Sequence, residues 1–359
     1  MPLRGVKRPM NENNSWKRFA NSKITISLLI LGMLLLFNLF FTKNFFAIEI
    51  KEGHLFGNLI DILKGATPIM LLAIGLTLVI ATKGIDISVG SMVAISCAVV
   101  AVMIGGDLVM KGGAQVYVTR VPMAFAMMGA ITVTIVAGMW NGMLVSRVGM
   151  QPIIATLILM VAGRGIAQMI TRGQIITIYY EPFSYIANGY LFMLPVPVYI
   201  VAFVLIITMF LARKTAMGMF IESVGINPTA ARYSGINAKN IIFWCYVFCG
   251  LCAGIAGIIY CSNVRSADGN NAGNLMELDA ILAVVLGGTS LAGGKFYLVG
   301  SIVGALIIQT LTTTIYARGV PPEITQVVKA LVIFVLSVAQ SDKFRTIFLD
   351  MFGKREITS

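Results

Sequence analysis

Residues 24–41 read ITISLLILGMLLLFNLFF, a run of 18 residues without a charge. A helix that crosses a bilayer needs about 20 predominantly apolar residues. Basic residues precede this run, as they do in a signal peptide, but Thr42 and Lys43 follow it and no small-residue cleavage site is present. The run therefore predicts an uncleaved transmembrane helix.

The composition of the chain has the same character. Of its 359 residues, 58% are hydrophobic and only 12% are charged, and the mean hydropathy is +0.88. A soluble domain carries about a quarter charged residues. We expect an all-α polytopic membrane protein with one transmembrane domain over residues 24–340. A basic tail over residues 1–23 precedes this domain, and a second tail over residues 341–359 follows it.

Apolar runs along the chain predict ten spanning segments. They are 24–41, 66–82, 88–104, 121–146, 152–170, 195–212, 240–261, 278–291, 296–315 and 324–340. The segments 66–82, 88–104 and 278–291 are short for a span of about 20 residues. We expect these three to be broken or half-spanning helices buried among their neighbours.

The positive charges predict the orientation. With ten spans, 17 of the 27 Lys and Arg residues fall on the side of the two tails and eight on the opposite side. Lys and Arg concentrate on the cytoplasmic side of membrane proteins, so both termini are predicted to be cytoplasmic. The net charge of +12 thus reflects membrane orientation and does not indicate nucleic-acid binding.

Residues 286–296, LGGTSLAGGKF, contain glycines that run into a lysine and suggest a phosphate-binding loop. The P-loop pattern requires glycine five residues before its Gly-Lys pair and a hydroxyl residue after the lysine. Thr289 and Phe296 occupy those two positions. The stretch instead predicts a tight helix–helix turn with Lys295 at the cytoplasmic surface, and no bound cofactor is expected in this chain.

The five cysteines and the single histidine give no metal or catalytic set. Cys249 and Cys252 have the spacing of a redox or zinc pair, but they lie in an apolar segment beside Gly250 and Gly254. We interpret them as small packing residues. His54, alone in an outside loop, has no companion ligand in the sequence, and we expect no metal site.

Residues 83–90, KGIDISVG, interrupt an apolar run with a carboxylate. A charge at the centre of a bilayer costs roughly 2.5–3.5 kcal/mol on insertion scales, so Asp86 should be capped, paired or placed at a mouth of the pathway. Either Asp86 or Ser88 can cap the helix that follows by accepting its free N–H groups. The alternative is a direct role in gating or substrate contact.

The longest inside loop, residues 213–239, predicts a short helix over residues 228–234. Asn227 is a favoured N-cap, Pro228 suits the first helical position, and Gly235 suits the position after the end. A plain loop helix is one interpretation. We favour a rigid knob that docks into a partner protein.

Two short segments, Val89-Gly-Ser-Met-Val-Ala and Val299-Gly-Ser-Ile-Val-Gly, resemble each other. Internal duplication is common in transporters, and these segments are compatible with one. Arg164 and Lys329 lie within predicted helices among small or apolar residues. We interpret each as a partner between helices or as a snorkelling end, and the alternative is a group that lines a pore.

Several stretches, in order, resemble one protein family. They are Gly84-Ile-Asp-Ile-Ser-Val-Gly-Ser91, Trp140-Asn-Gly142, Gln151-Pro-Ile-Ile-Ala-Thr-Leu157, Ala162-Gly-Arg-Gly165, Gly225-Ile-Asn-Pro-Thr-Ala-Ala-Arg-Tyr-Ser-Gly235, Glu277-Leu-Asp-Ala-Ile-Leu-Ala-Val-Val-Leu-Gly-Gly-Thr-Ser-Leu-Ala-Gly-Gly294 and Gln326-Val-Val-Lys-Ala330. Together they resemble the permease subunits of bacterial ATP-binding-cassette (ABC) importers for monosaccharides, the ribose, xylose and galactofuranose group. Leu55-Phe-Gly, Asp61-Ile-Leu and Ala267-Asp-Gly-Asn-Asn-Ala-Gly273 are most similar to the galactofuranose type.

The resemblance implies a multi-pass protein of the bacterial inner membrane that is not itself an enzyme. It implies three partners: a cytoplasmic ATPase that uses ATP and Mg²⁺, a second permease subunit, identical or related, and a periplasmic sugar-binding protein. It also implies that the helix at residues 228–234 is the coupling helix and sits in a cleft of the ATPase. The residues assigned to this contact are Asn227, Pro228, Thr229, Ala230, Ala231, Arg232, Tyr233, Ser234 and Gly235.

Two further groups of candidate residues follow. The candidates for the translocation path or its gate are Asp86, Ser88, Ser91, Asn141, Thr156, Arg164, Gln168 and Gln309. The amide-rich outside loop 262–273 supplies the candidates for an outer gate or a binding-protein contact, Arg265, Asp268, Asn270 and Asn271. An ordinary solvated loop is the alternative for this second group.

Two other functions would require features that this sequence lacks. An ion-coupled secondary transporter of a small polar solute should carry paired carboxylates or histidine relays inside its helices, and here the acidic residues are isolated or near helix ends. An intramembrane enzyme needs a nucleophile with a base, or a metal set, and the sequence offers neither.

Overall fold

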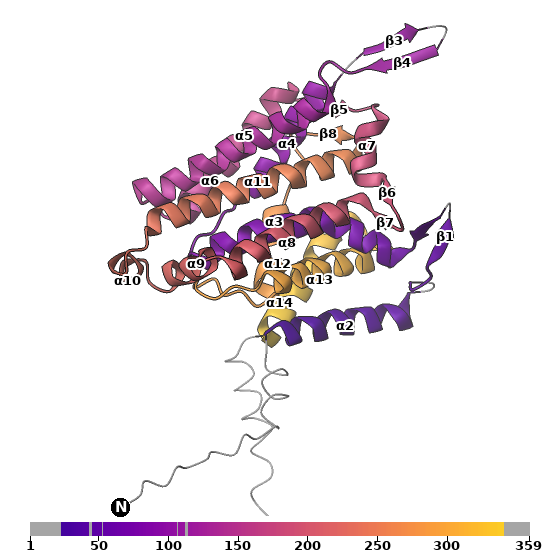
Figure 1. Ribbon diagram of the computed structural model, residues 1–359. Coiled ribbons are helices and arrows are strands. Elements are labelled where there is room, and N and C mark those ends of the chain that lie inside the picture. The colour runs from indigo at the N-terminus through magenta and orange to yellow at the C-terminus, as the bar shows by residue number, and fades with distance from the viewer. Residues whose placement is uncertain (1–22, 43–44, 52, 106, 112–113, 341–359) are drawn as a thin grey trace, which may run out of the picture.

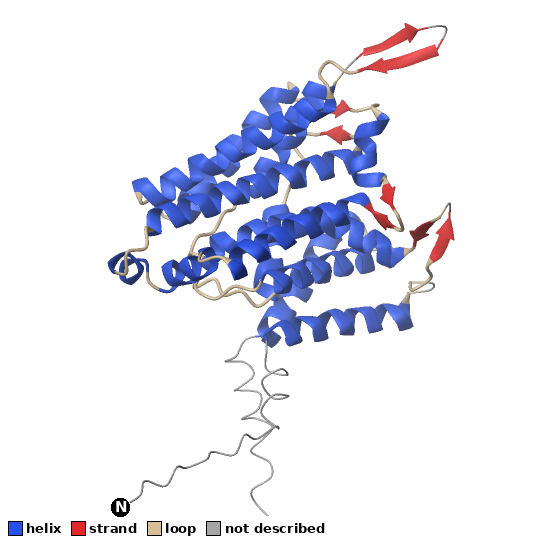
Figure 2. Cartoon of the chain, in the orientation of Figure 1, coloured by secondary structure: helices blue, strands red, loops and turns tan. Residues whose placement is uncertain are grey.

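The computed structural model describes residues 23–42, 45–51, 53–105, 107–111 and 114–340. Residues 1–22 of the first tail and all of the second tail, residues 341–359, lie outside the described residues. The described chain is a bundle of helices with short strands at some of the connections (Figure 2).

Each of the ten predicted segments overlaps one helix. The helices are α2 (Lys23–Phe41), α3 (Asn58–Ala81), α4 (Val89–Ile104), α5 (Met123–Met143), α6 (Pro152–Thr171), α8 (Val196–Lys214), α11 (Ala238–Val264), α12 (Met276–Leu286), α13 (Leu298–Ala317) and α14 (Pro322–Gln340). The connections contain α7 (Glu181–Asn188), α9 (Met217–Ile226), α10 (Pro228–Tyr233) and a π-helical turn at Leu144–Val148 that extends α5.

Four pairs of short antiparallel strands complete the connections. They are β1 (Glu49–Lys51) with β2 (His54–Phe56), β3 (Asp107–Lys111) with β4 (Ala114–Val118), β5 (Ile176–Thr177) with β8 (Ser266–Ala267), and β6 (Tyr190–Leu191) with β7 (Leu194–Pro195). The pair β5–β8 joins segments that are distant in sequence, because it ties the connection after α6 to the end of α11.

Among the described residues, seven helices are long and apolar enough to cross a membrane: α2, α3, α5 with its π-helical turn, α6, α8, α11 and α13. Of the three segments expected to be incomplete, α4 has 16 residues and α12 has 11. The expectation was wrong for α3, which has 24 residues. It continues beyond the apolar run because Lys64 donates to Asn188 and Asp61 is exposed to solvent.

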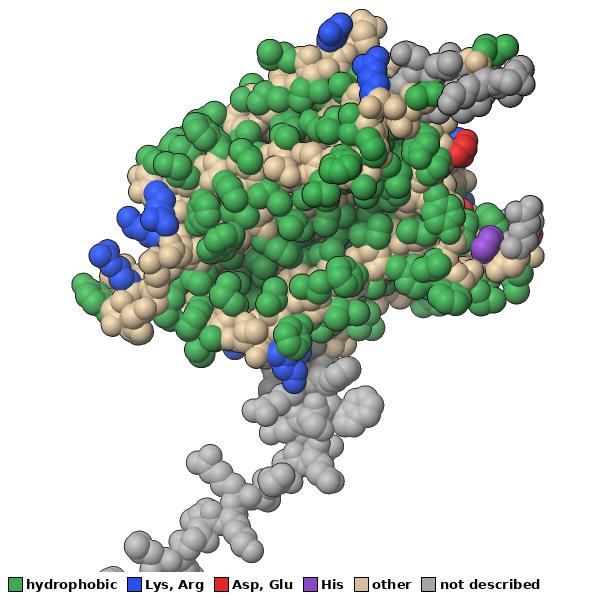
Figure 3. All heavy atoms as spheres, turned by 45° about the horizontal axis from the view of Figure 1, so that its top comes forward, with side chains coloured by type: hydrophobic (Ala, Val, Ile, Leu, Met, Phe, Trp, Pro, Cys, Tyr) green, Lys and Arg blue, Asp and Glu red, His purple; other side chains and the backbone are tan. Residues whose placement is uncertain are grey.

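The interior of the bundle is formed by α3, α4, α11 and α13, and the outer layer includes α2, α5, α6 and α8 (Figure 1). The outward faces of α5, α6 and α8 carry large apolar side chains such as Phe125, Met169 and Phe203. Figure 3 shows hydrophobic side chains over the middle of the visible face and Lys and Arg towards its ends. An apolar belt of this kind is what a bilayer requires.

The two ends of the bundle differ (Figure 1). At one end, the α10 end, lie α9, α10 and exposed basic residues that include Arg147, Arg213, Lys214 and Lys295. At the opposite end, the hairpin end, lie β1–β2 and β3–β4. The basic residues agree with the predicted cytoplasmic assignment of the α10 end.

The helices form two sets in inverted order. In the first set, α3 runs to the α10 end, residues 82–88 turn back, and the short helix α4 follows. In the second set, α11 runs to the hairpin end, residues 265–275 turn back, and the short helix α12 follows (Figure 1). Helices α5 and α6 then correspond to α13 and α14. The packing of the two sets matches in two ways. The first helix of each set packs on the third helix of the other set, α3 on α13 and α11 on α5. The short helix packs on the third helix of its own set, α4 on α5 and α12 on α13.

In the inverted sets, the counterpart of α4 is α12. The resemblance noticed in the sequence relates different helices. Val89 and Val299 lie at the starts of α4 and α13, which run in the same direction and are not counterparts. The duplication is therefore one of inverted topology, as in many transporters.

The two short helices meet near their N-termini. A Cβ atom on Gly90 would overlap the backbone oxygen of Gly273 and the carboxylate of Glu277, and one on Gly273 would overlap the backbone oxygen of Gly90. Gly273 also has a φ of +67°, which side chains rarely adopt. Glycine at both positions therefore allows the first turn of α4 to cross the segment that precedes α12 in close contact.

Candidate functional site

The predicted surface helix is confirmed as α10. The Asn227 side chain accepts hydrogen bonds from the backbone N–H groups of Thr229 (3.0 Å) and Ala230 (3.1 Å), and Pro228 takes the first position. The helix ends at Tyr233, one residue earlier than expected, and Gly235 follows with a φ of +83°. Ala231 faces the protein, whereas the other residues from 227 to 235 are exposed, Tyr233 to 88%.

The end of α9, which leads into α10, touches both helix sets. Helix α9 ends at Ile226, whose backbone oxygen accepts from Lys83 Nζ (2.9 Å). The next contact is Gly225, where a Cβ atom would overlap the backbone oxygen of Ala81 and approach the nitrogen of Gly294 to 2.5 Å. The Gly294 N–H in turn donates to Ala81 (2.9 Å). The end of α3 and the α12–α13 turn therefore meet at the end of α9, immediately before α10.

The α12–α13 turn is the glycine-rich stretch that resembled a phosphate-binding loop. It connects two helices, and three of its glycines, Gly288, Gly293 and Gly294, have positive φ values. Lys295 is exposed at the α10 end. The predicted role as a helix–helix turn is confirmed.

Four of the predicted path residues form one buried cluster between α4, α5 and α6. Asp86 Oδ1 accepts from the backbone N–H of Ser88 (3.0 Å), from its hydroxyl (2.6 Å) and from the Asn141 amide (3.4 Å). Asn141 also donates to the Ser88 hydroxyl (2.8 Å), and Thr156 binds the backbone of Ile85 and Ile87. All four side chains are fully buried.

The capping prediction for this cluster was only partly right. Ser88 is the residue before α4, but its side chain accepts no hydrogen bond from the first turn of the helix. Asp86 instead closes a turn within the 82–88 segment. Ser91, the fifth predicted residue here, donates to the backbone oxygens of Ser88 (2.8 Å) and Leu159 (3.2 Å), which ties α4 to α6.

The remaining two predicted residues of α6 hold the opposite turning segment, residues 265–275. Arg164 donates to the backbone oxygen of Ala272, and Gln168 Nε2 donates to Asn270 Oδ1 (2.6 Å). Arg164 is therefore a partner between segments, as expected. One face of α6 thus contacts both segments that precede a short helix. Thr156 contacts residues of the 82–88 segment, and Arg164 contacts the 265–275 segment.

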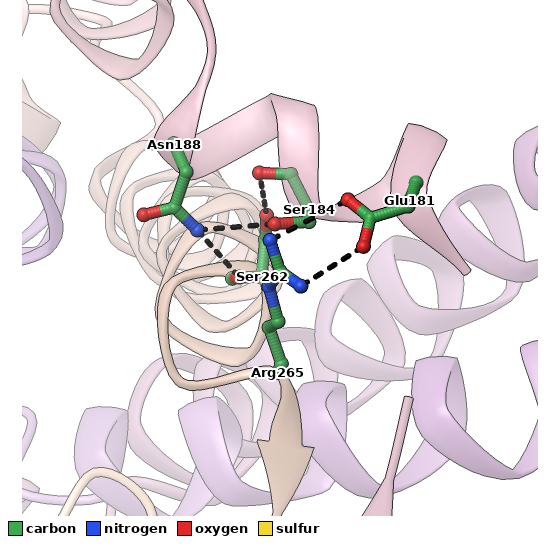
Figure 4. A network of polar contacts seen from close by, with 5 residues as sticks. All are labelled: Glu181, Ser184, Asn188, Ser262 and Arg265. Carbon is green, nitrogen blue, oxygen red and sulfur yellow. Dashed lines mark hydrogen bonds and ion pairs between the residues drawn. The ribbon is translucent and has the colours of Figure 1, made fainter. Parts of the chain in front are cut away.

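The outer-loop candidates lie at the hairpin end but do not form one group. Arg265 is paired with Glu181 of α7 through its two terminal guanidinium nitrogens, Nη1 and Nη2 (3.1 and 3.4 Å; Figure 4). Asp268 accepts from the backbone of Asn270 (2.8 Å) and the side chain of Asn271 (2.7 Å) and so shapes a local turn. The amides of Asn270 and Asn271 are exposed at this turn.

Gln309 lies on α13, apart from the other predicted path residues, and faces a cavity at the hairpin end. Sequence reasoning missed Glu277, whose side chain is buried at the start of α12 and whose Oε2 has no hydrogen-bond partner among the described residues. It also missed Tyr246, fully buried beside Gly84, with an unpartnered hydroxyl in the same part of the chain. An acidic residue in an apolar helix was the available signal for Glu277.

Comparison with known proteins identifies the family of this bundle. A family model described as a branched-chain amino acid transport system permease component matches residues 58–337, which includes both inverted helix sets. The chain belongs to that permease family. Its members are membrane components of transport systems and not enzymes.

Three curated proteins show how this permease relates to others. The galactofuranose transporter permease protein YtfT of Escherichia coli K12 is 49% identical over 88% of this chain and 89% of its own. The fructose import permease protein FruF of Bifidobacterium longum is 38% identical over 96% and 95% of the two chains. The ribose import permease protein RbsC of Escherichia coli K12 is 36% identical over 84% and 88%. No solved structure matches this permease.

Proposed function

We propose that this chain is the membrane subunit of an ABC importer that moves a monosaccharide across the bacterial inner membrane. The permease family and the sugar-import names of the three relatives support this function. The identity of 49% to the galactofuranose permease makes a hexose in its furanose form the first candidate substrate. The acidic residues in the described helices do not form the relay expected of an ion-coupled transporter.

The proposed assembly contains two permease subunits, a cytoplasmic ATPase and a periplasmic sugar-binding protein. ATP and Mg²⁺ are used by the ATPase, which agrees with the departures of the glycine-rich turn from the P-loop pattern. The transmembrane domain spans residues 24–340. The α10 end and both tails face the cytoplasm, in agreement with the exposed basic residues at that end.

The contacts at the end of α9, next to α10, are the main structural support for coupling between the ATPase and the helix bundle. In this proposal, α10 sits in a cleft of the ATPase. A movement of α10 is transmitted through α9 to Lys83 and Ala81. Residues 82–88 continue from there to the Asp86 cluster and α4. The same contact reaches the α12–α13 turn through Gly294. One surface helix is therefore able to bias both inverted sets between two packings, which is what alternating access requires.

The predicted gate residues take two roles in this proposal. The cluster of Asp86, Ser88, Ser91, Asn141 and Thr156 holds the 82–88 segment against α6, and Arg164 and Gln168 hold the 265–275 segment. Each segment precedes a short helix and lies towards one end of the bundle. We assign the first group to the inner gate and the second, with Asp268, Asn270 and Asn271, to the outer gate.

Uptake in proteoliposomes tests the function. The permease is reconstituted with its ATPase and binding protein, and uptake of radiolabelled D-galactose, D-fructose and D-ribose is measured with ATP inside. We expect ATP-dependent uptake of one of these sugars that an uncoupler does not abolish. Uptake that an uncoupler abolishes and that persists without ATP would establish the ion-coupled transporter instead.

A further inference from the structure

A cavity of about 280 Å³ lies at the hairpin end, at the interface of the two inverted helix sets. Helix α3 of the first set and helices α11, α12 and α13 of the second set form most of its walls, and Ala187 of α7 and Pro197 of α8 complete them. Ligand pockets commonly lie between the helices of a bundle. A cavity of this volume suits one small solute.

The polar groups of the cavity are available for a ligand. Tyr260, Asn263 and Gln309 line it, and none of these side chains has a hydrogen bond to another residue in the described part of the chain. Lys64 also lines it, with Nζ 2.7 Å from Asn188 Oδ1. Amide, phenol and ammonium groups together supply both donors and acceptors, and a sugar hydroxyl requires both.

The rest of the lining is apolar. Pro68, Ile69, Pro197 and Ile259 contribute to it. A monosaccharide presents C–H groups on its ring as well as hydroxyl groups at its rim. Specific pockets are generally built in this way, with a predominantly apolar surface and a few placed polar groups.

The wall next to α7 is fixed in place by a hydrogen-bond network (Figure 4). Ser262 of α11 donates to the backbone oxygen of Phe183 (2.7 Å) and accepts from the N–H of Ala187 (3.0 Å), a residue that lines the cavity. Asn188 donates to Ser184 (3.2 Å) and to the backbone oxygen of Ser262 (3.3 Å). Because α7 is bound to α11 at several points, the cavity exists before any ligand enters.

Position 65 shows how closely Gln309 is packed. A Cβ atom on Gly65 would lie 2.7 Å from Gln309 Nε2. Glycine at this position therefore leaves room for the amide, and an alanine would displace it.

We propose that this cavity is a transient binding site for a neutral monosaccharide inside the permease, with Gln309, Asn263 and Tyr260 binding its hydroxyl groups. The proposal rests on the proposed function and adds a substrate contact within this chain. The site receives the sugar at the outer side before the bundle changes packing. Lys64, held by Asn188, is the fourth polar group of the site.

Substitutions that keep volume and remove hydrogen bonding test the site in the complete importer. Gln309→Met and Tyr260→Phe are each compared with wild type for initial uptake of the transported sugar at saturating loaded binding protein. A neutral hydrogen bond is worth enough to change occupancy about twofold to tenfold, and we expect uptake to fall by that factor. Gln326→Met on α14, an exposed position, makes the same chemical change outside the cavity and should leave uptake unchanged.

ATPase activity separates loss of the site from loss of folding or coupling. We expect the variants to keep the wild-type ATPase response to loaded binding protein, so that sugar uptake per ATP falls. Gly65→Ala should also lower uptake, because it displaces the Gln309 amide.

A labelling experiment tests the site without the partners. All five native cysteines are buried, so a cysteine introduced at the exposed position 263 is accessible to a membrane-impermeant maleimide. We expect D-galactose or D-ribose at high concentration to slow labelling of Asn263→Cys at least about twofold, and L-glucose to have no such effect. Gln174→Cys, exposed after α6 at the same end, is the control that sugar should not protect.

Two results would overturn the proposal: uptake by Gln309→Met and Tyr260→Phe equal to that of wild type, or labelling of Asn263→Cys unaffected by either sugar. Protection of Asn263→Cys by inorganic phosphate alone would assign the cavity to an anion held by Lys64. That result would also reject the proposal of a sugar site. If wild type itself shows no ATP-dependent uptake of any sugar, the proposed function fails, and this outcome is distinct from loss of the cavity site.

Discussion

Lys329 of α14 lies 2.6 Å from Asp279 of α12, Nζ to Oδ2, and both side chains are largely buried. This ion pair joins the last long helix to the short helix of its own set. Among the described side chains of α14, only Thr325 and Ile333 are buried. Few of its side chains are therefore buried against the bundle, and the ion pair is one of its contacts. The prediction that Lys329 is a partner between helices is confirmed.

Removal of one member of this pair should destabilise the protein more than removal of both. A buried charge without its partner is costly, whereas a matched apolar pair of similar size is often tolerated. We expect Lys329→Met or Asp279→Leu to lower the free energy of unfolding by up to about 3 kcal/mol, and the double variant to recover most of the loss. Unfolding in detergent, read by tryptophan fluorescence, gives the double-mutant cycle. Strictly additive losses would show that the two residues are not coupled.

The crossing of the two short helices is sensitive to one methyl group at Gly90. Gly90→Ala would place a Cβ atom against the Glu277 carboxylate and the Gly273 backbone. Overpacking at such a site costs about 1–3 kcal/mol, and we expect lower thermal stability and little transport.

Gly165→Ala is the matched control for this substitution. Gly165 also lies in a helix, but no atom lies within 4 Å of its ideal Cβ position apart from its own helix and chain neighbours. Its replacement should be neutral or stabilise by up to about 1 kcal/mol. Equal stability of the two variants would contradict the crossing described here.

Two substitutions at Asp86 distinguish a structural role from a gating role that needs the charge. Asp86→Asn keeps the Oδ1 acceptor that binds Ser88 and Asn141, and we expect transport within about twofold of wild type. Asp86→Ala leaves these buried donors without an acceptor, at a cost of about 1–3 kcal/mol for each, and should reduce the amount of folded protein. Uptake rates and size-exclusion profiles measure both effects. Loss of transport in a well-folded Asp86→Asn protein would assign the charge itself to the gate.

The α10 helix should depend on its N-cap. Asn227→Ala removes two hydrogen bonds from the first turn, a change that costs roughly 1 kcal/mol. Because α10 is the proposed ATPase contact, we expect weaker stimulation of ATPase activity by loaded binding protein while the permease remains folded. Ser223→Ala in α9 removes a hydroxyl that is bonded only within its own helix and is the control. A normal ATPase response in Asn227→Ala would argue against α10 as the coupling helix.

Local features of the fold were predictable because their causes are local. The cap at Asn227, the proline at 228 and the glycine at 235 together place α10 to within one residue. The apolar runs likewise place every long helix, since a bilayer selects for them directly. The start of α3 was misplaced by eight residues because Asp61 and Lys64 interrupt the apolar run, and the contact of Lys64 with Asn188 is distant in sequence.

The candidate site was predictable in its residue types but not in its grouping. Asp86, Ser88 and Thr156 stand out in the sequence as polar residues in apolar surroundings, and their meeting with Asn141 depends on how α5 and α6 pack. The cavity around Gln309 has no local signature, because its walls come from helices separated by up to 245 residues, from Lys64 to Gln309. Glu277 could be noticed in the sequence only as an acidic residue in an apolar segment.

The sequence by itself determined that the chain is a membrane protein, which segments form apolar helices and where a short surface helix begins. These properties follow from the free energy of apolar transfer and from hydrogen bonds between near neighbours. Only the tertiary structure decided that the helices form two inverted sets, that Gly90 meets Gly273, and that Lys329 pairs with Asp279. Those contacts depend on close packing between distant segments, and no short stretch of sequence encodes the shape of both partners.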